Sequence, residues 1–585
     1  MRRLFCGGAA VLMGSAVPTL AYADEPSLRV VYPPDGHETT AEQIFFIGTA
    51  PTPGLTINGQ PVPQSNAGHF APSFPLTLGE NRFAIRAGNE TQTIVITRNA
   101  AIPPLPEGPA FGDGSLAPAV DVARQGGEPF CFEAIAPTGG TVTATLQGQT
   151  VTLSPQRITQ LPPNSAVLTG LVDPLGTQTA YGGCILLEQE GDLGQPRYRL
   201  EMDGQTIEQT AFGSVDVLAS TPVQIATVTA PSGTARTGPS TTYSRLTPLP
   251  TGTQAMVTGQ EGDWWRLDYG AWIRASDVDV ETGVVSPRSL IRGVLGQELS
   301  DRTEIRFPLQ VPVPVSVDQR AGGLTLTLHN TTAQTDTIRL DDGPVIERLD
   351  WTQPAPGKVQ YHLSLKTAQA WGYELRYEGN TLVLALRHPP DIEPEAGLAG
   401  ASILLDPGHG SAEDLGSRGP TGLPEKDVTL TVARQLRDVL EARGSTVHMT
   451  RDGDEDLFPS DRVAMIEAIE PTIALSLHYN ALPDDGDAEA TAGIGTFWYH
   501  AQAHDLAVFL HNYLVEALDR PSYGVYWNNL ALTRPAIAPS VLLELGFMIN
   551  PDEFEWIVDP VAQTALVEAL ADGIEQWLLL TAAAD

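Results

Sequence analysis

Residues 403–410 read ILLDPGHG, an apolar run that stops at Asp-Pro-Gly and then presents a histidine. The run 403–405 predicts a buried strand. The glycines on both sides of His409 remove side-chain bulk and allow a sharp turn. His409 is therefore presented at the end of a strand rather than packed in a core, which is the placement of a ligand or a catalytic group.

The rest of the C-terminal third predicts the sheet to which this strand belongs. Apolar segments alternate with amphipathic ones from residue 401 to residue 582. Strands are expected at 402–408, 445–451, 472–478, 493–500 and 540–547, and helices at 426–443, 460–470, 503–519 and 560–580. This alternation predicts a three-layer α/β/α domain around a mostly parallel sheet, whose active site gathers at the carboxyl ends of the strands. His409, His478 and Glu544 lie at or near predicted strand ends.

Two histidines and a glutamate in this domain match a metal site. His409 follows the first strand, Glu425 precedes the first helix and His478 ends the third strand. Two imidazoles and one carboxylate, with a fourth position open to water, form the ligand set of a hydrolytic Zn²⁺ site. Either Glu413 or Asp414 is an alternative to Glu425.

A hydrolytic zinc site also needs a group that moves the proton of the attacking water. Glu544 is the candidate for this catalytic role, because an isolated glutamate on a buried strand is costly unless it is paired or used. Asn480 and Arg451 are candidates for orienting substrate or ligands, and a capping or salt-bridge role is the alternative for each.

Several motifs of residues 403–580 resemble the type 3 family of zinc-dependent N-acetylmuramoyl-L-alanine amidases. They are DPGHG at 406–410, EKD at 425–427, TRD at 450–452, SLHYNA at 476–481, and LELGF at 543–547 with Asn550. The resemblance implies that His409, Glu425 and His478 bind zinc and that Glu544 is the catalytic acid/base. It also implies cleavage of the amide between N-acetylmuramic acid and L-alanine of the peptidoglycan stem peptide. Some family members carry a long inhibitory helix at the position of residues 481–493, which are too few for one, so we expect no autoinhibition of that form.

The upstream part of the chain predicts several small all-β domains. Alternating apolar residues with Gly, Pro and Asn turns predict an immunoglobulin-like β-sandwich at 24–100 and a β-rich domain at 101–222. Residues 223–283 resemble the bacterial SH3-like family through RTGPS at 236–240, GDWW at 262–265 and GAWI at 270–273. That resemblance implies a small barrel that assists wall binding, with Trp265 or Trp272 in its core or at a ligand. Residues 284–388 resemble the localisation domains that precede some amidases, and 389–400 are expected to be a linker.

The N-terminus and the cysteines indicate an exported protein. Residues 1–23 combine a basic start, an apolar run and an A-x-A site, which predicts a signal peptide cleaved near Ala23 and Asp24. Cys6 falls too early in that run for a lipoprotein site. In an oxidising compartment Cys131 and Cys184 favour a disulfide, with two buried thiols as the alternative. No further segment predicts a transmembrane span.

The amino-acid composition limits the classes of molecule that the protein is expected to bind. A net charge of −36 over 585 residues argues against nucleic acid and against an anionic membrane surface. The sequence therefore favours an enzyme of the periplasm or cell wall that acts on peptidoglycan. A zinc peptidase or deacetylase of the wall and an inactive wall-binding scaffold are the alternatives. The chain lacks an H-E-x-x-H motif, which argues against the common zinc peptidases. Protein partners, including divisome proteins, stay open.

Overall fold

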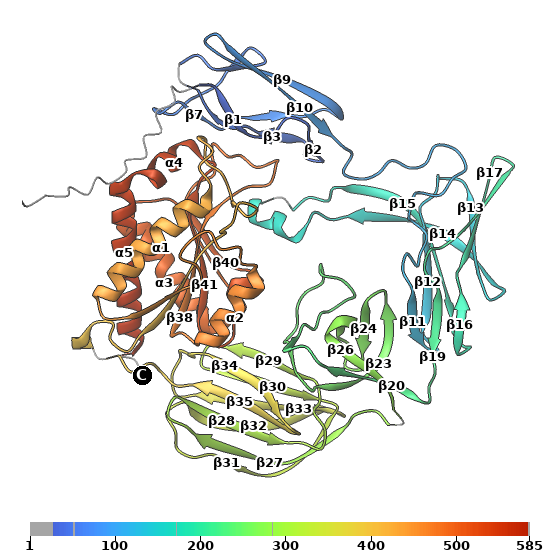
Figure 1. The fold of residues 1–585 in the computed structure, drawn as a ribbon. Helices are drawn as coiled ribbons and strands as arrows, with labels where there is room; N and C mark the ends of the chain where they lie inside the picture. Colours follow the sequence, from blue (N-terminus) through green and yellow to red (C-terminus); the bar gives the residue numbers. More distant parts are fainter. Residues whose placement is uncertain (1–26, 51–52, 171, 284, 393, 583–585) are drawn as a thin grey trace, which may run out of the picture.

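The computed structural model describes residues 27–50, 53–170, 172–283, 285–392 and 394–582. The predicted signal peptide at 1–23, its cleavage point and Cys6 lie outside these residues. Four β-rich units precede a C-terminal α/β domain, as Figure 1 shows. Within the described residues, no helix has the length and apolar character needed to cross a bilayer.

The C-terminal domain is built on a six-stranded sheet of order β37-β36-β38-β41-β39-β40, parallel except for the β39–β41 pair. Its elements are β36 (Ser402–Pro407), α1 (Glu425–Ala442), β37 (Thr446–Met449), α2 (Pro459–Ile469), β38 (Ile473–Asn480), β39 (Ile494–Trp498), α3 (Ala501–Leu518), β40 (Ser522–Trp527), η4 (Ala531–Thr533), β41 (Ser540–Phe547), α4 (Pro551–Val558) and α5 (Pro560–Ala582). The mostly parallel sheet agrees with the prediction. Strand β40 and helix α4 come in addition to the predicted elements. Helix α4 starts where the Asn550 side chain accepts hydrogen bonds from the backbone N–H groups of Asp552 and Glu553.

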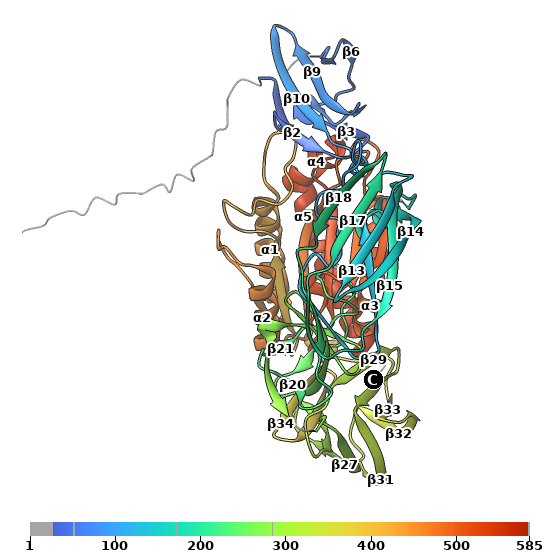
Figure 2. The same cartoon turned by 90° about the vertical axis from the view of Figure 1, so that its right-hand side faces the viewer.

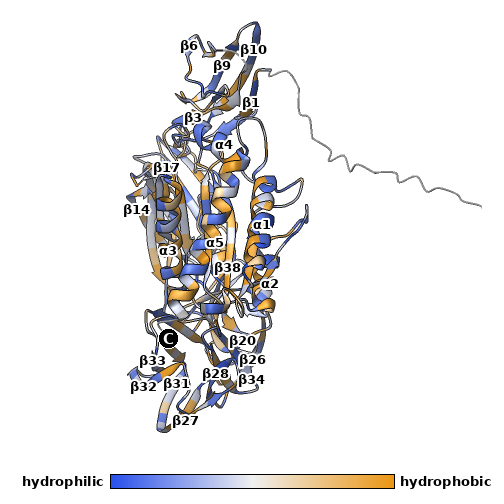
Figure 3. Ribbon diagram, turned by 90° about the vertical axis from the view of Figure 1, so that its left-hand side faces the viewer, coloured by the Kyte–Doolittle hydropathy of each residue, from blue (hydrophilic) through white to orange (hydrophobic). Residues whose placement is uncertain are grey.

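Helices cover the two faces of this sheet unequally. Ile403 and Leu405 of β36 point to the face covered by α1, α3 and α5, whereas Leu404 between them packs with α2 and η4 on the other face. Helix α1 buries Val428, Val432, Leu436 and Leu440 at helical spacing. In Figure 3 the hydrophobic colour follows β38 and much of α5, while α1 alternates between both colours. The sheet is thus buried on both sides, and only its ends are available for a site.

The first β unit is a small sandwich whose strands lie between Arg29 and Arg98. Its strands are β1 (Arg29–Tyr32), β2 (His37–Thr39), β3 (Gln43–Phe45), β4 (Ile47–Thr49), β5 (Thr56–Ile57), β6 (Gln60–Pro61), β7 (His69–Phe70), β8 (Ser73–Pro75), β9 (Gly79–Ala87) and β10 (Glu90–Arg98). The pairings are antiparallel except for β2 with β10. Ile44, Phe46, Ile57 and Ile85 are fully buried between the sheets.

The second and third β units share a sheet across the predicted boundary at residue 222. The second contains β11 (Val122–Gln125), β12 (Pro129–Ala134), β13 (Thr141–Leu146), β14 (Gln149–Gln160), η1 (Asn164–Thr169), β15 (Gly176–Leu186), β16 (Gly191–Gly194), β17 (Arg197–Met202), β18 (Gln205–Thr210) and β19 (Val215–Leu218). The third contains β20 (Val223–Val228), β21 (Ser232–Gly233), β22 (Leu249–Pro250), β23 (Gln254–Glu261), β24 (Trp264–Leu267), β25 (Trp272–Arg274), η2 (Ala275–Asp277) and β26 (Val278–Gly283). Strand β23 pairs with β11, which joins the two units into one sheet.

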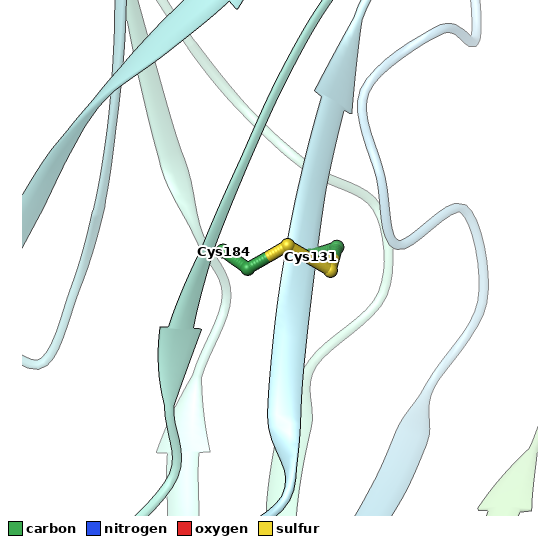
Figure 4. The surroundings of a disulfide bond; sticks show 2 residues. All are labelled: Cys131 and Cys184. Atoms are coloured by element: carbon green, nitrogen blue, oxygen red, sulfur yellow. A yellow bond between two sulfur atoms is a disulfide. The ribbon is translucent and has the colours of Figure 1, made fainter.

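Two features of these units bear on the predictions. Cys131 of β12 and Cys184 of β15 lie directly opposite each other and form a disulfide, drawn in Figure 4. Trp272 is buried in the third unit, where the guanidinium carbons of Arg124 and Arg266 lie 5.9 and 6.0 Å from the centre of its ring. Trp265 is half-buried against the same core.

The fourth β unit packs directly on the C-terminal α/β domain. It is a two-sheet sandwich of β27 (Ser289–Glu298), β28 (Arg302–Pro308), β29 (Val315–Arg320), β30 (Gly323–His329), β31 (Thr331–Arg339), β32 (Ile346–Ala355), β33 (Lys358–Leu365), β34 (Tyr373–Glu378) and β35 (Thr381–Arg387). Trp371 of this unit lies 5.6 Å from Trp577 of α5, measured between ring centres. The segment 389–400, expected to be a linker, contains η3 (Pro394–Ala396) and buries Ile392 and Leu398 in the core of the α/β domain. It is a packed connection rather than a free spacer.

The first and second β units also contact the C-terminal domain. In Figures 1 and 2 the first unit lies beyond the α4 end of that domain, and the β14–β15 hairpin extends from the second unit with η1 at its tip. The Tyr523 hydroxyl of β40 donates a hydrogen bond to the carbonyl oxygen of Leu168 in η1, at 2.9 Å. Both upstream units therefore contact the domain that carries the predicted site.

Candidate active site

A buried aspartate holds together the strand ends on which the site is built. Asp406, in β36, is 1% exposed. Its Oδ1 atom accepts hydrogen bonds from Thr450 (2.6 Å) and Arg462 (2.5 Å), and its Oδ2 atom accepts one from Ser476 of β38 (2.6 Å). Burial alone would raise the pKa of Asp406, but the Arg462 charge and the hydroxyl bonds outweigh it and hold this pKa below its usual range. The ionised carboxylate thus ties β36 to β38 and to the residue that follows β37.

The turn after β36 brings His409 against His478. His409 itself adopts a positive φ of 61°, so the strained backbone falls on the histidine and not on its glycine neighbours. A side chain at Gly408 would overlap the His478 imidazole, which explains why a glycine is required there. The two imidazole centres lie 5.0 Å apart. The glycine before His409 therefore permits close approach of the second histidine.

Glu425 completes a group of three potential metal ligands. It begins helix α1 and is 2% exposed. Its Oε1 atom lies 3.3 Å from His409 Nε2 and 3.1 Å from His478 Nδ1. One ligand atom from each of the three residues lies within 4.8 Å of the other two. The structure thus brings together the three residues that the sequence predicts as ligands.

Neighbouring groups fix the Glu425 carboxylate and its charge. Oε2 accepts hydrogen bonds from the backbone N–H (2.8 Å) and hydroxyl (3.0 Å) of Ser417, and Oε1 accepts one from the Tyr479 N–H at 2.9 Å. Burial opposes ionisation of Glu425, but the hydrogen bonds and charges of His409 and His478 prevail and lower its pKa. The carboxylate is therefore held ionised in a fixed orientation, as a metal ligand must be.

Asp414, the alternative ligand, has a different position. Its Oδ1 atom lies 2.6 Å from Nδ1 of His409, on the side of the ring that faces away from Glu425. Burial would lower the pKa of His409, but Glu425 and Asp414 outweigh it and raise this pKa to about 9. Asp414 therefore orients the imidazole ring, and Glu413 has no atom in the group of potential ligands.

Glu544 faces the same group from the neighbouring strand. In β41 it lies directly opposite His478 of β38. Its Oε2 atom is buried and has no hydrogen-bond partner in the part of the chain that the structure describes. Burial, and then the negative charge of Glu425, raise the pKa of Glu544 well above its ordinary value. An unpartnered carboxyl group with a high proton affinity is suited to hold and release a proton.

The two further predicted residues differ in their roles. Arg451 is 2% exposed and donates to the carbonyl oxygens of Pro407 and Gly408, each at 2.9 Å. These hydrogen bonds stabilise the turn that carries His409. The Asn480 side chain accepts a hydrogen bond from the next backbone N–H, that of Ala481, and so caps the strand end locally.

The first β unit contacts the segment that follows the His478 strand. Residues 481–493 contain turns and no helix. Asp484 in this segment accepts a hydrogen bond from the Tyr32 hydroxyl, and its Oδ2 atom lies 2.9 Å from His37 Nε2. Gln43 donates to the carbonyl oxygen of Asp485 at 2.6 Å. Phe45, Ile47 and Ala71 pack with Ala488, Phe547 and Ile549 beside these bonds.

These surroundings are the part of the site that sequence reasoning missed. Asp406 stands in the quoted motif, and its position at the end of an apolar strand was the available signal of a structural role. No local pattern indicates that Tyr32 contacts Asp484, or that Leu168 contacts Tyr523, across more than 300 residues of chain. Only the folded chain brings them together.

Comparison with known proteins connects this geometry with a family. A family model described as N-acetylmuramoyl-L-alanine amidase matches residues 403–576. The germination-specific N-acetylmuramoyl-L-alanine amidase of Bacillus subtilis is 32% identical over 202 residues, which cover 31% of this chain and 81% of that protein. The probable cell wall amidase LytH of Staphylococcus epidermidis is 30% identical over 181 residues, 31% of this chain and 59% of its own length. The chain therefore spans less than two thirds of that relative.

A solved structure is also similar to part of the chain. N-acetylmuramoyl-L-alanine amidase AmiC2 of Nostoc punctiforme is 28% identical, with 31% of this chain and 97% of that chain covered and a TM-score of 0.29.

Loss of the Arg462 side chain should destabilise the α/β domain strongly. Arg462→Ala leaves Asp406 charged and buried without its cation, and breaking a buried pair costs about 3–5 kcal/mol. Urea unfolding of the domain, followed by tryptophan fluorescence, measures the change. Arg320→Ala is the matched control, because Arg320 and its partner Asp318 are 82% and 62% exposed. We expect a change of about 0–1 kcal/mol for this control. An equal effect of both variants would contradict the role given to Asp406.

Loss of the Asp484 side chain should loosen the segment after the His478 strand. Asp484→Ala removes the bonds from Tyr32 and His37, each of which involves a charged group and contributes roughly 1.5–3 kcal/mol. Backbone amides of residues 482–488 should then exchange with deuterium about tenfold faster or more. Glu489→Ala is the control in the same segment, since the Glu489 side chain is exposed. Unchanged exchange in Asp484→Ala would show that this contact does not hold the segment.

Proposed function

The chain belongs to the N-acetylmuramoyl-L-alanine amidase family, and from that premise we propose that it is an exported, zinc-dependent peptidoglycan hydrolase. The bond cleaved is the amide between the lactyl group of N-acetylmuramic acid and L-alanine of the stem peptide. One observation carries the proposal: His409, Glu425 and His478 converge at the strand ends, with Glu544 on the adjacent strand opposite His478.

The three converging residues fit a zinc ion. Two imidazole nitrogens and one carboxylate oxygen form a donor set that zinc takes in hydrolytic sites, and the buried, ionised Glu425 needs a cation beside it. Zinc bound there supplies a Lewis acid that polarises an amide carbonyl and makes water a better nucleophile. Asp414 and Ser417 hold two of the ligands in place through hydrogen bonds.

Glu544 moves the proton in this proposal. Its carboxylate takes a proton from the attacking water. The burial that raises the pKa of Glu544 favours holding this proton until the amide nitrogen accepts it. The carboxylic acid then gives the proton to the amide nitrogen as the carbon–nitrogen bond breaks. The second proton of the water, left on the new carboxyl group, passes to the released amine, so the products are the muramic acid carboxylate and a peptide with an L-alanine ammonium group, and Glu544 returns to its carboxylate form.

The upstream units serve to hold the enzyme on the wall. Residues 223–283 form a small β unit whose sequence resembles wall-binding SH3-like domains, and 284–388 resemble amidase localisation domains. The disulfide between Cys131 and Cys184 is consistent with the exported location that residues 1–23 predict. The proposed location is therefore the periplasm or the cell wall.

Replacement of Glu544 should remove turnover but not metal binding. Protein from Asp24 onward is incubated with purified peptidoglycan, and mass spectrometry identifies the released fragments. Wild-type protein should release peptides that begin with L-alanine, and Glu544→Gln should reduce this rate about 10²–10⁴-fold. Glu516→Gln, at an exposed glutamate of α3, is the matched control and should keep the wild-type rate.

Removal of the metal or of a ligand should abolish the same activity. A chelator should stop release, and added zinc should restore it. His478→Ala should bind less than one zinc per chain by elemental analysis, while Glu544→Gln should keep the wild-type zinc content. Cuts within the stem peptide or lost acetyl groups would identify a peptidase or a deacetylase instead. Wall binding without any release would identify a scaffold.

A further inference from the structure

Four arginines gather where the third β unit meets the catalytic domain. We call them the arginine cluster: Arg236, Arg245, Arg274 and Arg534. Within the described residues, none of their guanidinium groups forms an ion pair with a carboxylate. This is notable in a chain with 34 Lys and Arg against 70 Asp and Glu, and in a catalytic domain where residues 400–585 hold 9 against 30.

Two members of the cluster lie over one tryptophan of the third unit, and a third is bridged to one of them. The guanidinium carbons of Arg236 and Arg274 lie 6.0 and 5.4 Å from the centre of the Trp264 ring. Arg274 is the strand partner of Trp264, and Arg236 forms a β-bridge with Arg245. The backbone pairing of this unit therefore forces three positive side chains together.

The catalytic domain adds the fourth arginine and an aromatic pair. Arg534 follows η4, and Tyr499 follows β39. Burial, and then the charges of Arg245 and Arg236, lower the pKa of Arg534 to about 10. The Tyr499 ring stacks on Trp527 with centres 5.3 Å apart, and Trp527 is 60% exposed. A flat aromatic surface thus adjoins the positive charges.

The cluster lacks the bonds that would compensate its charge. Arg236 is 7% exposed and donates to the carbonyl oxygens of Thr241 and Tyr243, but its Nε atom is buried and has no partner within the described part of the chain. The only hydrogen bond of the Arg245 side chain among the described residues is a long one, 3.3 Å to the Thr234 hydroxyl. Gathering four cations, three of them partly desolvated, costs free energy unless an anion joins them.

Three of these side chains remain reachable from solvent. Arg274 is exposed, and Arg245 and Arg534 are half-buried. A planar guanidinium matches the two oxygens of a carboxylate or a phosphate. The chemistry of the cluster is therefore that of an oxyanion site beside an aromatic surface, which suits an acidic group carried on a sugar or a peptide.

We propose that the arginine cluster binds carboxylate groups of peptidoglycan and so positions the polymer on the enzyme. The inference rests on the proposed function, because it takes the substrate class from there. Tyr499 follows the last residue of β39 and lies four residues beyond Gly495, which pairs with Glu544. Because β39 runs antiparallel to β41, these residues lead toward the amino ends of β38 and β41, so the cluster adjoins the edge of the sheet opposite the metal-ligand group. The cluster therefore contacts a part of the polymer that is separate from the bond to be cleaved.

Binding of the full chain from Asp24 onward to purified peptidoglycan tests this proposal. Glu544→Gln serves as the parent protein, so that the polymer is not consumed, and sedimentation at several salt concentrations gives the affinity. Adding Arg534→Ala or Arg274→Ala to the parent should weaken binding about tenfold each, because each removes a charge-assisted bond. Arg197→Ala, at an exposed arginine of β17 that forms no ion pair within the described ranges, is the matched control and should bind as the parent does.

Chemical changes to the polymer identify the oxyanion. Amidation of the peptidoglycan carboxyl groups should weaken binding of the parent about tenfold and leave the arginine variants unaffected. If removal of wall phosphate weakens binding and amidation does not, the carboxylate assignment is overturned. Equal binding by parent and arginine variants would overturn the site itself.

Two further measurements separate a loss of binding from a loss of folding, and separate this proposal from the proposed function. Arg534→Lys keeps the charge but loses the planar fork, so it should bind more weakly than the parent at unchanged thermal stability. Should wild-type protein fail to release L-alanine peptides while the arginine effects on binding persist, the proposed function fails and the binding site stands.

Discussion

The Asp406 carboxylate is the constraint on which the site depends. It is buried, ionised and bonded to three side chains: Ser476 of β38, Thr450 directly after β37, and Arg462 of α2. Loss of any of these bonds would leave a charge in a region that cannot solvate it, so the strand ends keep their relative positions. His409 follows this residue by three positions, and His478 follows Ser476 by two. The distance between the imidazoles is therefore fixed by an interaction that uses neither of them.

The two glutamates of the site are driven toward opposite protonation states. Glu425 receives hydrogen bonds from Ser417 and Tyr479 and lies between two imidazoles, which lower its pKa. Glu544 has no such donor among the residues that the structure describes, and the charge of Glu425 adds to burial in raising its pKa. One carboxylate is thus prepared to bind a cation and the other to carry a proton. This division of roles needs no difference in residue type, only a difference in neighbours.

The β units also contact the C-terminal domain that carries the site. The first unit bonds to Asp484 in the segment after His478, and the tip of the β14–β15 hairpin bonds to Tyr523. Tyr523 packs against Phe547, three residues beyond Glu544 on the same strand. The fourth unit and the segment 389–400 extend the core of the sheet domain. Mutations far from the C-terminal domain can thus reach the site through packed contacts.

The sequence by itself determined the α/β domain and the identity of the residues at its strand ends. Alternating apolar and amphipathic segments predict a mostly parallel sheet. The motifs at the strand ends identify His409, His478 and Glu544, because each strand and the turn after it are formed by residues that are close in the chain. Tertiary structure alone decided that the units before and after residue 222 share a sheet, and that four arginines meet without an ion-paired carboxylate among the described residues. These depend on which segments pack against each other. Local sequence patterns do not predict this packing, because the elements that contact each other are separated by tens to hundreds of residues in the chain.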